Sequence, residues 1–248
     1  MNAEGPSVVL YQVATVDGRV ALSPGVLLMG DVRWPHYDGG GYSAVFARHH
    51  PDALLEGSGT LVLPDAGPLD WSDPVPEVEP GHYLPEAVLA RATSWFAVVD
   101  SRGRVTWGFK EFPYPEWAGM HVLVLVARAT PAGYLAYLRR EQIPYLVVGQ
   151  ERVDLTEALT TMRTVLGVQT VVATPGAELG GALLREGLID QLEIEVLPIL
   201  AGGRRTPVML RSPDLAPTEP PTGVHLRDAT VFADGRVLLS YTVESPAE

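Results

Sequence analysis

The sequence predicts an α/β protein built around a mixed, mostly parallel β-sheet with helices on both faces and an antiparallel hairpin at the C-terminal end. Three observations predict this fold. Short apolar runs rich in β-branched residues recur along the chain, and most are apolar nearly throughout, which is typical of strands buried on both faces. Amphipathic helical patterns separate the later runs, as crossover helices do in parallel sheets. The last two runs flank an Asp-Gly turn, which indicates a hairpin.

The expected elements follow one another in a regular order. Seven apolar runs predict strands over residues 8–14, 53–55, 95–99, 121–127, 144–149, 170–173 and 192–200. Three helices separate the later strands, over residues 132–141, 155–166 and 177–186. Pro131 suits a first helical turn, Asp154 is a typical N-cap, and Gly187 is a typical left-handed C-cap. The hairpin comprises residues 224–232 and 237–243.

The length of 248 residues is compatible with one domain or two. Residues 31–42, 64–85 and 107–119 have the composition of insertions, rich in glycine, in proline and acids, and in aromatic residues respectively. Because no linker separates two apolar cores, we expect a single domain spanning residues 1–248.

Composition and charge exclude several classes of function. A net charge of −12 argues against nucleic acid as a partner, since phosphate backbones bind clustered Lys and Arg. The chain has no cysteine, which removes disulfides, thiolate nucleophiles and Cys-ligated metals. His36, His49 and His50 lack an acidic partner at metal spacing, so no metal site is expected. No apolar stretch approaches the ~20 residues of a membrane span, and we expect a soluble cytoplasmic protein.

Candidate binding residues follow the predicted strands, because open parallel sheets bind ligands beyond the carboxyl ends of their strands. The segment from Thr15 to Ala21 reads as a tight turn containing Asp-Gly. Gly57-Ser58-Gly59-Thr60 is either a plain turn or a loop that allows close approach of a phosphate. The segment from Thr174 to Leu179 joins a strand to a helix. Thr174 could cap this helix with Pro175 as its first residue, or the exposed N–H groups could face a pyrophosphate.

Together these segments resemble the family of riboflavin-biosynthesis pyrimidine reductases, which share the fold of dihydrofolate reductase. The resemblance extends from about residue 8 to residue 203. It rests on the order and spacing of Thr15-x-Asp17-Gly18-Arg19-Val20-Ala21, Arg48 with Asp52-Ala53, Gly57-x-Gly59-Thr60, Val98-Val99-Asp100-Ser101-x-Gly103-Arg104, Gly180-Gly181-Ala182-Leu183-Leu184-Arg185-x-Gly187-Leu188-Ile189-Asp190 and Pro198-x-Leu200-x-Gly202-Gly203.

The resemblance implies an NADPH-dependent reductase that works as a homodimer on a ribosylamino-pyrimidine 5′-phosphate, whose ribose becomes ribityl. It also implies the roles of residues. Val20 and Ala21 would lie against the nicotinamide. The cofactor phosphates would be bound by Gly57, Gly59 and Thr60, the adenosine half by Asp100, Ser101 and Arg102, and the pyrophosphate by Thr174, Gly176, Ala177, Glu178 and Leu179. Asp65 follows the phosphate loop and is the candidate catalytic residue, positioning substrate or relaying a proton.

Departures from the family pattern keep other functions open. At the position of Thr174 the family carries Glu or Asp followed by Gly-Gly, whereas this chain has Thr174-Pro175-Gly176. One alternative is a reductase of the same fold that acts on a pterin, a folate or a secondary metabolite. Another is a non-catalytic ligand-binding homodimer that has lost cofactor affinity. Lys110 is either a phosphate ligand beneath an aromatic lid or part of an aromatic loop in a dimer interface. Asp190 is expected to orient the strand that follows it.

Overall fold

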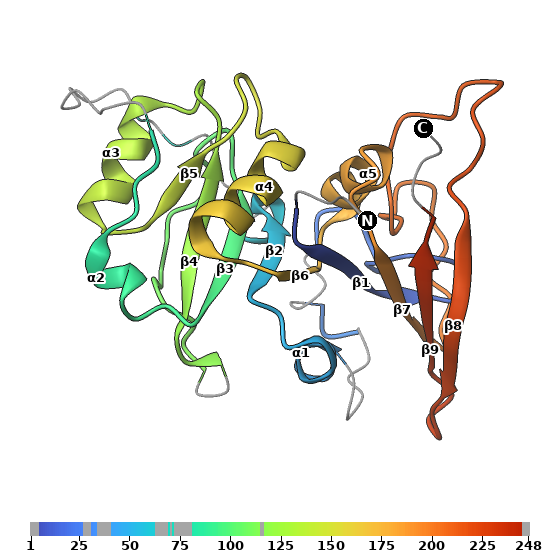
Figure 1. Ribbon diagram of the computed structural model, residues 1–248. Helices are drawn as coiled ribbons and strands as arrows, with labels where there is room; N and C mark the ends of the chain where they lie inside the picture. The colour runs from blue at the N-terminus through green and yellow to red at the C-terminus, as the bar shows by residue number, and fades with distance from the viewer. Residues whose placement is uncertain are drawn as a thin grey trace. The chain divides into compact units, whose positions relative to one another are not determined.

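The computed structural model in Figure 1 describes residues 5–26, 31–33, 41–62, 69, 71, 81–114 and 117–244. Its strands are β1 (Ser7–Thr15), β2 (Ala53–Gly57), β3 (Ser94–Val99), β4 (Met120–Val126), β5 (Tyr145–Val147), β6 (Thr170–Ala173), β7 (Gln191–Leu197), β8 (Val224–Val231) and β9 (Val237–Val243). Its α-helices are α1 (Gly41–His49), α2 (Glu86–Leu89), α3 (Ala132–Arg140), α4 (Leu155–Leu166) and α5 (Ala177–Arg185). None of these helices is long and apolar enough to cross a membrane.

The chain forms two compact units. The first unit contains residues 7–50 and 172–248, and the second contains residues 51–171. Strand β6 is the point where the chain passes from the second unit to the first, with residues 170–171 in one and residues 172–173 in the other. The prediction of a single domain over residues 1–248 stays a prediction.

The second unit is a parallel sheet with strand order β5-β4-β3-β2. Every residue of β4 is buried, which is the behaviour expected of a central parallel strand covered on both faces. Helix α4 packs through Leu155, Ala158, Leu159 and Met162, the apolar side predicted from the sequence. Asp154 caps it by accepting a hydrogen bond from the Glu157 N–H at 2.9 Å, as predicted.

The first unit is mixed. Strand β1 pairs in parallel with β7, which pairs in antiparallel with β9, and β8 lies at the edge beyond β9. The hairpin β8–β9 turns at Gly235, whose φ of 88° favours glycine. Figure 1 shows this hairpin in red and orange at the C-terminal end of the colour range.

The predicted fold class is confirmed: the chain has a mixed, mostly parallel sheet, helices between its strands and a C-terminal antiparallel hairpin. Several details were wrong, and the short helix α2 was not predicted. Helix α1 was not predicted, because residues 31–42 resembled an insertion. Strand β7 ends at Leu197 instead of residue 200, since Pro198 has no N–H to continue the ladder. Helix α5 is capped by Gly176 in an extended conformation, so Thr174 and Pro175 lie before the helix.

Candidate functional site

The turn after β2 contains the predicted phosphate loop. Gly57 ends the strand, and Ser58–Thr60 form one turn of 3-10 helix. Gly59 is exposed, its φ lies outside the left-handed region, and a Cβ built there would have no described atom within 4 Å. The fold itself therefore does not require glycine at position 59. A ligand that lies close to the backbone there would require it, because a side chain would stand in the way.

The Thr60 side chain makes its hydrogen bonds within the turn after β2. Its hydroxyl donates to Glu56 Oε2 at 2.7 Å and also lies 2.9 Å from the Gly57 carbonyl. A hydroxyl carries a single proton, and Thr60 donates it to Glu56. This is the proton that the sequence analysis assigned to a phosphate. In this conformation Thr60 closes the turn.

The turn after β3 is held by two side chains, buried Asp100 and half-buried Ser101. Asp100 is 1% exposed, and its Oδ2 accepts hydrogen bonds from the backbone N–H groups of Arg104 at 2.7 Å and Val105 at 3.0 Å. Ser101 Oγ accepts from the Val153 N–H at 3.0 Å. Both side chains therefore hold loops in place. Burial, together with the Asp100 charge, raises the pKa of the Tyr134 hydroxyl well above its usual range, so this hydroxyl stays neutral beside the turn.

The turns after β2 and β3 are joined directly. Arg104 Nη2 donates to Ser58 Oγ at 2.7 Å, which brings the predicted phosphate loop and the predicted adenosine segment to one edge of the second unit. Trp71, which the sequence analysis did not single out, also holds the β3 turn. Its indole N–H donates to the Gly103 carbonyl at 2.8 Å, and its ring packs 5.3 Å from that of Tyr134.

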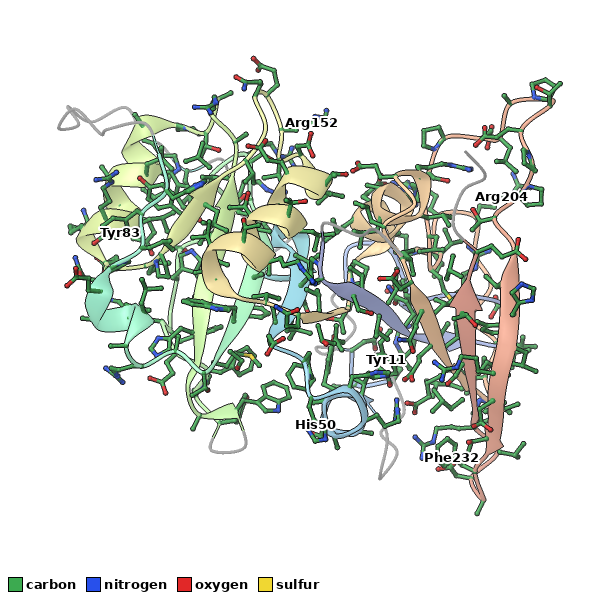
Figure 2. All side chains as sticks on the ribbon, viewed as in Figure 1. Tyr11, His50, Tyr83, Arg152, Arg204 and Phe232 are labelled. Carbon is green, nitrogen blue, oxygen red and sulfur yellow. The ribbon has the colours of Figure 1, made fainter. Side chains whose placement is uncertain are left out.

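Three exposed arginines occupy the loops after β3, β4 and β5. Arg102, Arg128 and Arg152 make no side-chain hydrogen bond or ion pair within the described part of the chain. Figure 2 labels Arg152. Their loops are tied together: Thr130 Oγ1 donates to the Ser101 carbonyl at 2.9 Å, and the Arg128 N–H donates to the Gly149 carbonyl at 3.1 Å. One end of the sheet thus carries three available cations in a chain of net charge −12.

In the first unit, Asp17 links two distant parts of the family pattern. Its carboxylate accepts hydrogen bonds from the Thr15 hydroxyl at 2.7 Å and from the N–H groups of Ala201 at 3.0 Å and Gly202 at 2.7 Å. These hydrogen bonds, that of Thr15 foremost, hold the pKa of Asp17 well below its usual range. Asp17 therefore stays ionised at neutral pH and joins the turn after β1 to the loop after β7.

An extended segment, residues 206–211, joins the other predicted residues of this unit. The Val20 N–H donates to the Pro207 carbonyl at 3.1 Å, and Ala21 is buried beside it in the chain. The Arg211 N–H donates to the Ala177 carbonyl at 2.8 Å. A Cβ on Gly181 would overlap the Arg211 carbonyl, so the glycine pair of α5 allows this segment to pass. The sequence analysis missed the segment because it has no periodic pattern.

The start of α5 is a helix end without a side-chain cap in the described part of the chain. Its N-cap, Gly176, is exposed, and no described side chain caps the helix. A Cβ at Gly176 would meet no described atom within 4 Å. The N–H groups of Ala177, Glu178 and Leu179 belong to the first turn, where helical partners are missing and the helix dipole favours negative charge. Glu178 itself is exposed and pairs with Arg211 at 3.1 Å.

The structure shows the surroundings of some of the remaining residues that the sequence analysis singled out. Asp65 lies outside the described residues. Lys110 pairs with Glu141 at 3.2 Å, and the aromatic rings around it pack on Phe96 of the same unit. Asp190 accepts a hydrogen bond from the Val8 N–H at 2.8 Å, so its side chain holds the start of β1, and its predicted role in orienting the strand that follows it stays a prediction. Within the described ranges no three His, Asp or Glu side chains form a group that could hold a metal.

The structure therefore brings the predicted residues together in two sets. In the second unit, Gly57–Thr60 and Asp100–Arg102 share one edge of the sheet. In the first unit, the segment from Thr15 to Ala21 and the start of α5 contact the same residues 206–211. The family described as the RibD C-terminal domain matches residues 6–240. The chain belongs to this family.

Its relatives are reductases of riboflavin biosynthesis and proteins like them. The 2,5-diamino-6-ribosylamino-4(3H)-pyrimidinone 5′-phosphate reductase of Methanothermobacter thermautotrophicus is 24% identical over 203 residues, which cover 80% of this chain and 81% of that protein. Acinetobacter baumannii RibD superposes with a TM-score of 0.60 at 22% identity, over 99% of this chain and 60% of that chain. A pyrimidine reductase-like protein from Corynebacterium diphtheriae gives a TM-score of 0.64 at 14% identity, over 96% of this chain and 92% of that chain. The chain thus has the fold of these proteins and spans 60% of the RibD chain.

Proposed function

We propose that this chain is an NADPH-dependent reductase that acts on a ribosylamino-pyrimidine 5′-phosphate, the class of substrate in the name of its Methanothermobacter relative. The observation that carries the proposal is the start of α5. An uncapped helix end behind a glycine with open space around it suits the pyrophosphate of a dinucleotide. In the second unit, Gly59 likewise has open space where a Cβ would lie, which suits the approach of a phosphate to its backbone.

The residues present fit a nicotinamide dinucleotide, which when bound supplies a hydride. The chain's own part is binding and orientation. In the second unit, Gly57 and Gly59 would bind phosphate through their backbone N–H groups, and in the first unit the first turn of α5 would do so. Val20, whose N–H donates to the Pro207 carbonyl, and Ala21 would hold the nicotinamide in the first unit. Asp65 is the proposed group that positions the substrate or moves a proton.

A preference for NADPH over NADH is supported by Arg102, Arg128 and Arg152. Only NADPH carries a 2′-phosphate, and arginines beyond parallel strands can accommodate it through charge-assisted hydrogen bonds. Free guanidinium groups on three linked loops supply such donors without disturbing an existing ion pair.

The test is a fluorescence titration of the protein with NADPH and with NADH. We expect a micromolar dissociation constant for NADPH, about 8 kcal/mol of binding free energy. Arg102→Gln and Arg128→Gln should each weaken NADPH binding about tenfold and leave NADH binding unchanged. Arg140→Gln, an exposed arginine that pairs with Glu141 on α3, is the matched control. Millimolar binding of both cofactors by the wild type would favour the non-catalytic alternative.

A second candidate function is a reductase of the same fold with another substrate, such as a pterin, a folate or a secondary metabolite. It is favoured by Thr174, which replaces the family's acid and is only 7% exposed. Pro175 is fixed by the Gln12 side chain, which donates to its carbonyl. Oxidation of NADPH in the presence of the ribosylamino-pyrimidine phosphate separates the candidates, because only the first requires turnover. The homodimer, which the resemblance implies, and the cytoplasmic location, which was expected from the lack of a long apolar stretch, both stay predictions.

A further inference from the structure

A buried histidine near the start of β4 has a side-chain nitrogen without a hydrogen-bond partner. His121 is 5% exposed, and its Nε2 makes no hydrogen bond with any residue that the structure describes. Glu111 Oε2 lies 3.6 Å from this nitrogen, which is too long for a hydrogen bond. By contrast, His49 Nε2 lies 2.8 Å from a carboxylate oxygen of Glu193. A buried polar group without a partner costs free energy, and a charge on the same ring would cost more.

The carboxylate beside His121 already has other partners. Glu111 Oε1 accepts a hydrogen bond from the Gly119 N–H at 2.9 Å, and Oε2 accepts one from Arg91 Nη2 at 3.0 Å. The Gly119 N–H, more than the nearby charges, holds the pKa of Glu111 below its usual range, so this carboxylate stays ionised at neutral and mildly acidic pH. Glu111 can therefore reach His121 only by giving up one of these contacts.

Residues 108–112 lie along β4 at this point and form a short seam with it. The Phe112 N–H donates to the Met120 carbonyl, and the Val122 N–H donates to the Lys110 carbonyl, both at 2.9 Å. The two hydrogen bonds lie on either side of His121 in the chain. A movement of residues 108–112 away from β4 breaks both of them and brings the imidazole into contact with water.

The other groups around His121 add no charge to the seam. Its register partner on β3 is Trp95, which is apolar. The Lys110 ammonium is paired with Glu141 at 3.2 Å. Within the described residues, the charged groups that face the imidazole are thus the carboxylate and the guanidinium named above.

These surroundings make the closed seam sensitive to protons. Burial lowers the pKa of His121 below its ordinary value; the Glu111 charge opposes this shift, and the Arg91 charge adds to it. An imidazole in water therefore binds a proton more readily than this buried one. As the pH falls through the range in which histidine titrates, protons favour the conformation in which the ring meets water. Above that range the closed seam keeps its full stability.

We propose that residues 108–112 and β4 form a proton-sensitive latch, in which protonation of His121 releases residues 108–112 from the strand. An imidazolium carries two N–H donors, and both need acceptors. Glu111 can supply an acceptor only by leaving Gly119 or Arg91, and water can supply one only when the seam opens. Either route weakens the hydrogen bonds that join residues 108–112 to β4. The latch does not depend on which ligand the protein binds.

The test is amide hydrogen exchange of Phe112 and Val122, whose N–H groups cross the seam. In the whole protein, after correction for intrinsic rates, their protection should fall about fivefold to tenfold between about pH 7.5 and about pH 5.5. Amides of α4 are the internal reference and should keep their protection. In His121→Gln the two amides should respond to pH no more than the reference does. His225→Gln is the matched control, because His225 is exposed and pairs with Glu244.

Two charge variants test the latch even if His121→Gln does not fold. Glu111→Gln keeps an acceptor for the Gly119 N–H and removes the charge that favours protonation, so the midpoint of the exchange transition should move to lower pH. Arg91→Gln removes the charge that disfavours protonation, so the midpoint should move to higher pH. Equal protection at the two pH values in the wild type would overturn the inference. A shift in the same direction in both charge variants, or an undiminished pH response in His121→Gln, would overturn it as well.

Discussion

The two units use their charged residues differently at the ends of their parallel strands. In the second unit, the acid of the β3 turn is buried and supports two backbone N–H groups, and three arginines on linked loops are left available. In the first unit, Asp17 is partly exposed and joins two loops, and the available group is an uncapped helix end. In both units an acidic residue of the family pattern, Asp17 or Asp100, accepts hydrogen bonds from backbone N–H groups and holds the loops in place. The groups left for a ligand are backbone N–H groups and arginines.

The largest expected effect concerns Gly59 and tests whether the second unit binds cofactor. Gly59→Val should weaken NADPH binding by about a hundredfold or more, roughly 3 kcal/mol, because the side chain occupies the approach to the backbone. Stability should not change, since a Cβ at Gly59 meets no described atom. The measurement is a fluorescence titration beside a thermal melt.

Gly108→Val is the matched control, because Gly108 is also exposed with open space around its Cβ. It lies in the aromatic segment, residues 107–119. This segment pairs through Glu111 with His121 at the amino end of β4, away from the carboxyl ends of the strands. Equal affinities for NADPH in the wild type and the Gly59 variant would place the cofactor elsewhere.

Much of the fold follows from local patterns, and this explains what the sequence could predict. Helix α4 was predicted with its bounds because its cap, its apolar side and Gly167 agree on one answer. Strands β6 and β9 were predicted equally well from compact apolar runs bounded by polar residues. Helix α1 was missed because it begins at Gly41, a residue type that disfavours helices, and has Val45 as its single buried residue, so its periodicity is weak.

The structure shows what the predicted site residues contact within the chain, while their roles toward a ligand stay predictions. The turns at Gly57 and Gly176 were found because glycine marks backbone geometry directly in the sequence. Asp100, Ser101 and Thr60 were assigned to the cofactor, and the structure shows them as ties within the second unit. A sequence cannot distinguish a polar side chain that faces a ligand from one that faces its own backbone. Arg102 was among the predicted residues, whereas the other free arginines were missed because their lack of partners appears only in three dimensions.

The second prediction tests whether Gly181 allows residues 206–211 to pack against α5 in the first unit. Gly181→Ala should lower the free energy of unfolding by about 1–3 kcal/mol, because the added carbon overlaps the Arg211 carbonyl and displaces residues 206–211. Gly176→Ala is the control: it creates no overlap and should cost less than about 1 kcal/mol as a poorer N-cap. Urea unfolding measures both. Equal losses in the two variants would show that residues 206–211 do not depend on the glycine pair.

Variants of these two glycines also distinguish an effect on stability from an effect on NADPH affinity at the same helix. If the start of α5 binds a phosphate, Gly176→Ala should weaken NADPH binding while the protein keeps its stability. Gly181→Ala should weaken binding only as far as it displaces the segment behind Val20. An unchanged NADPH affinity in Gly176→Ala would contradict the assignment of this helix end to the pyrophosphate.

The smallest expected effect concerns Thr60, which distinguishes a frame residue from a ligand-binding residue most sharply. Its hydroxyl donates to Glu56, a carboxylate that is 8% exposed. Thr60→Val removes this hydrogen bond and should lower the free energy of unfolding by about 1 kcal/mol. NADPH affinity should stay within about twofold, because the proton of the hydroxyl is already used within the turn. Thr60→Ser keeps the hydroxyl and should restore the stability. The opposite result, a tenfold loss of NADPH affinity at unchanged stability, would mean that the hydroxyl turns from Glu56 to the cofactor when it binds.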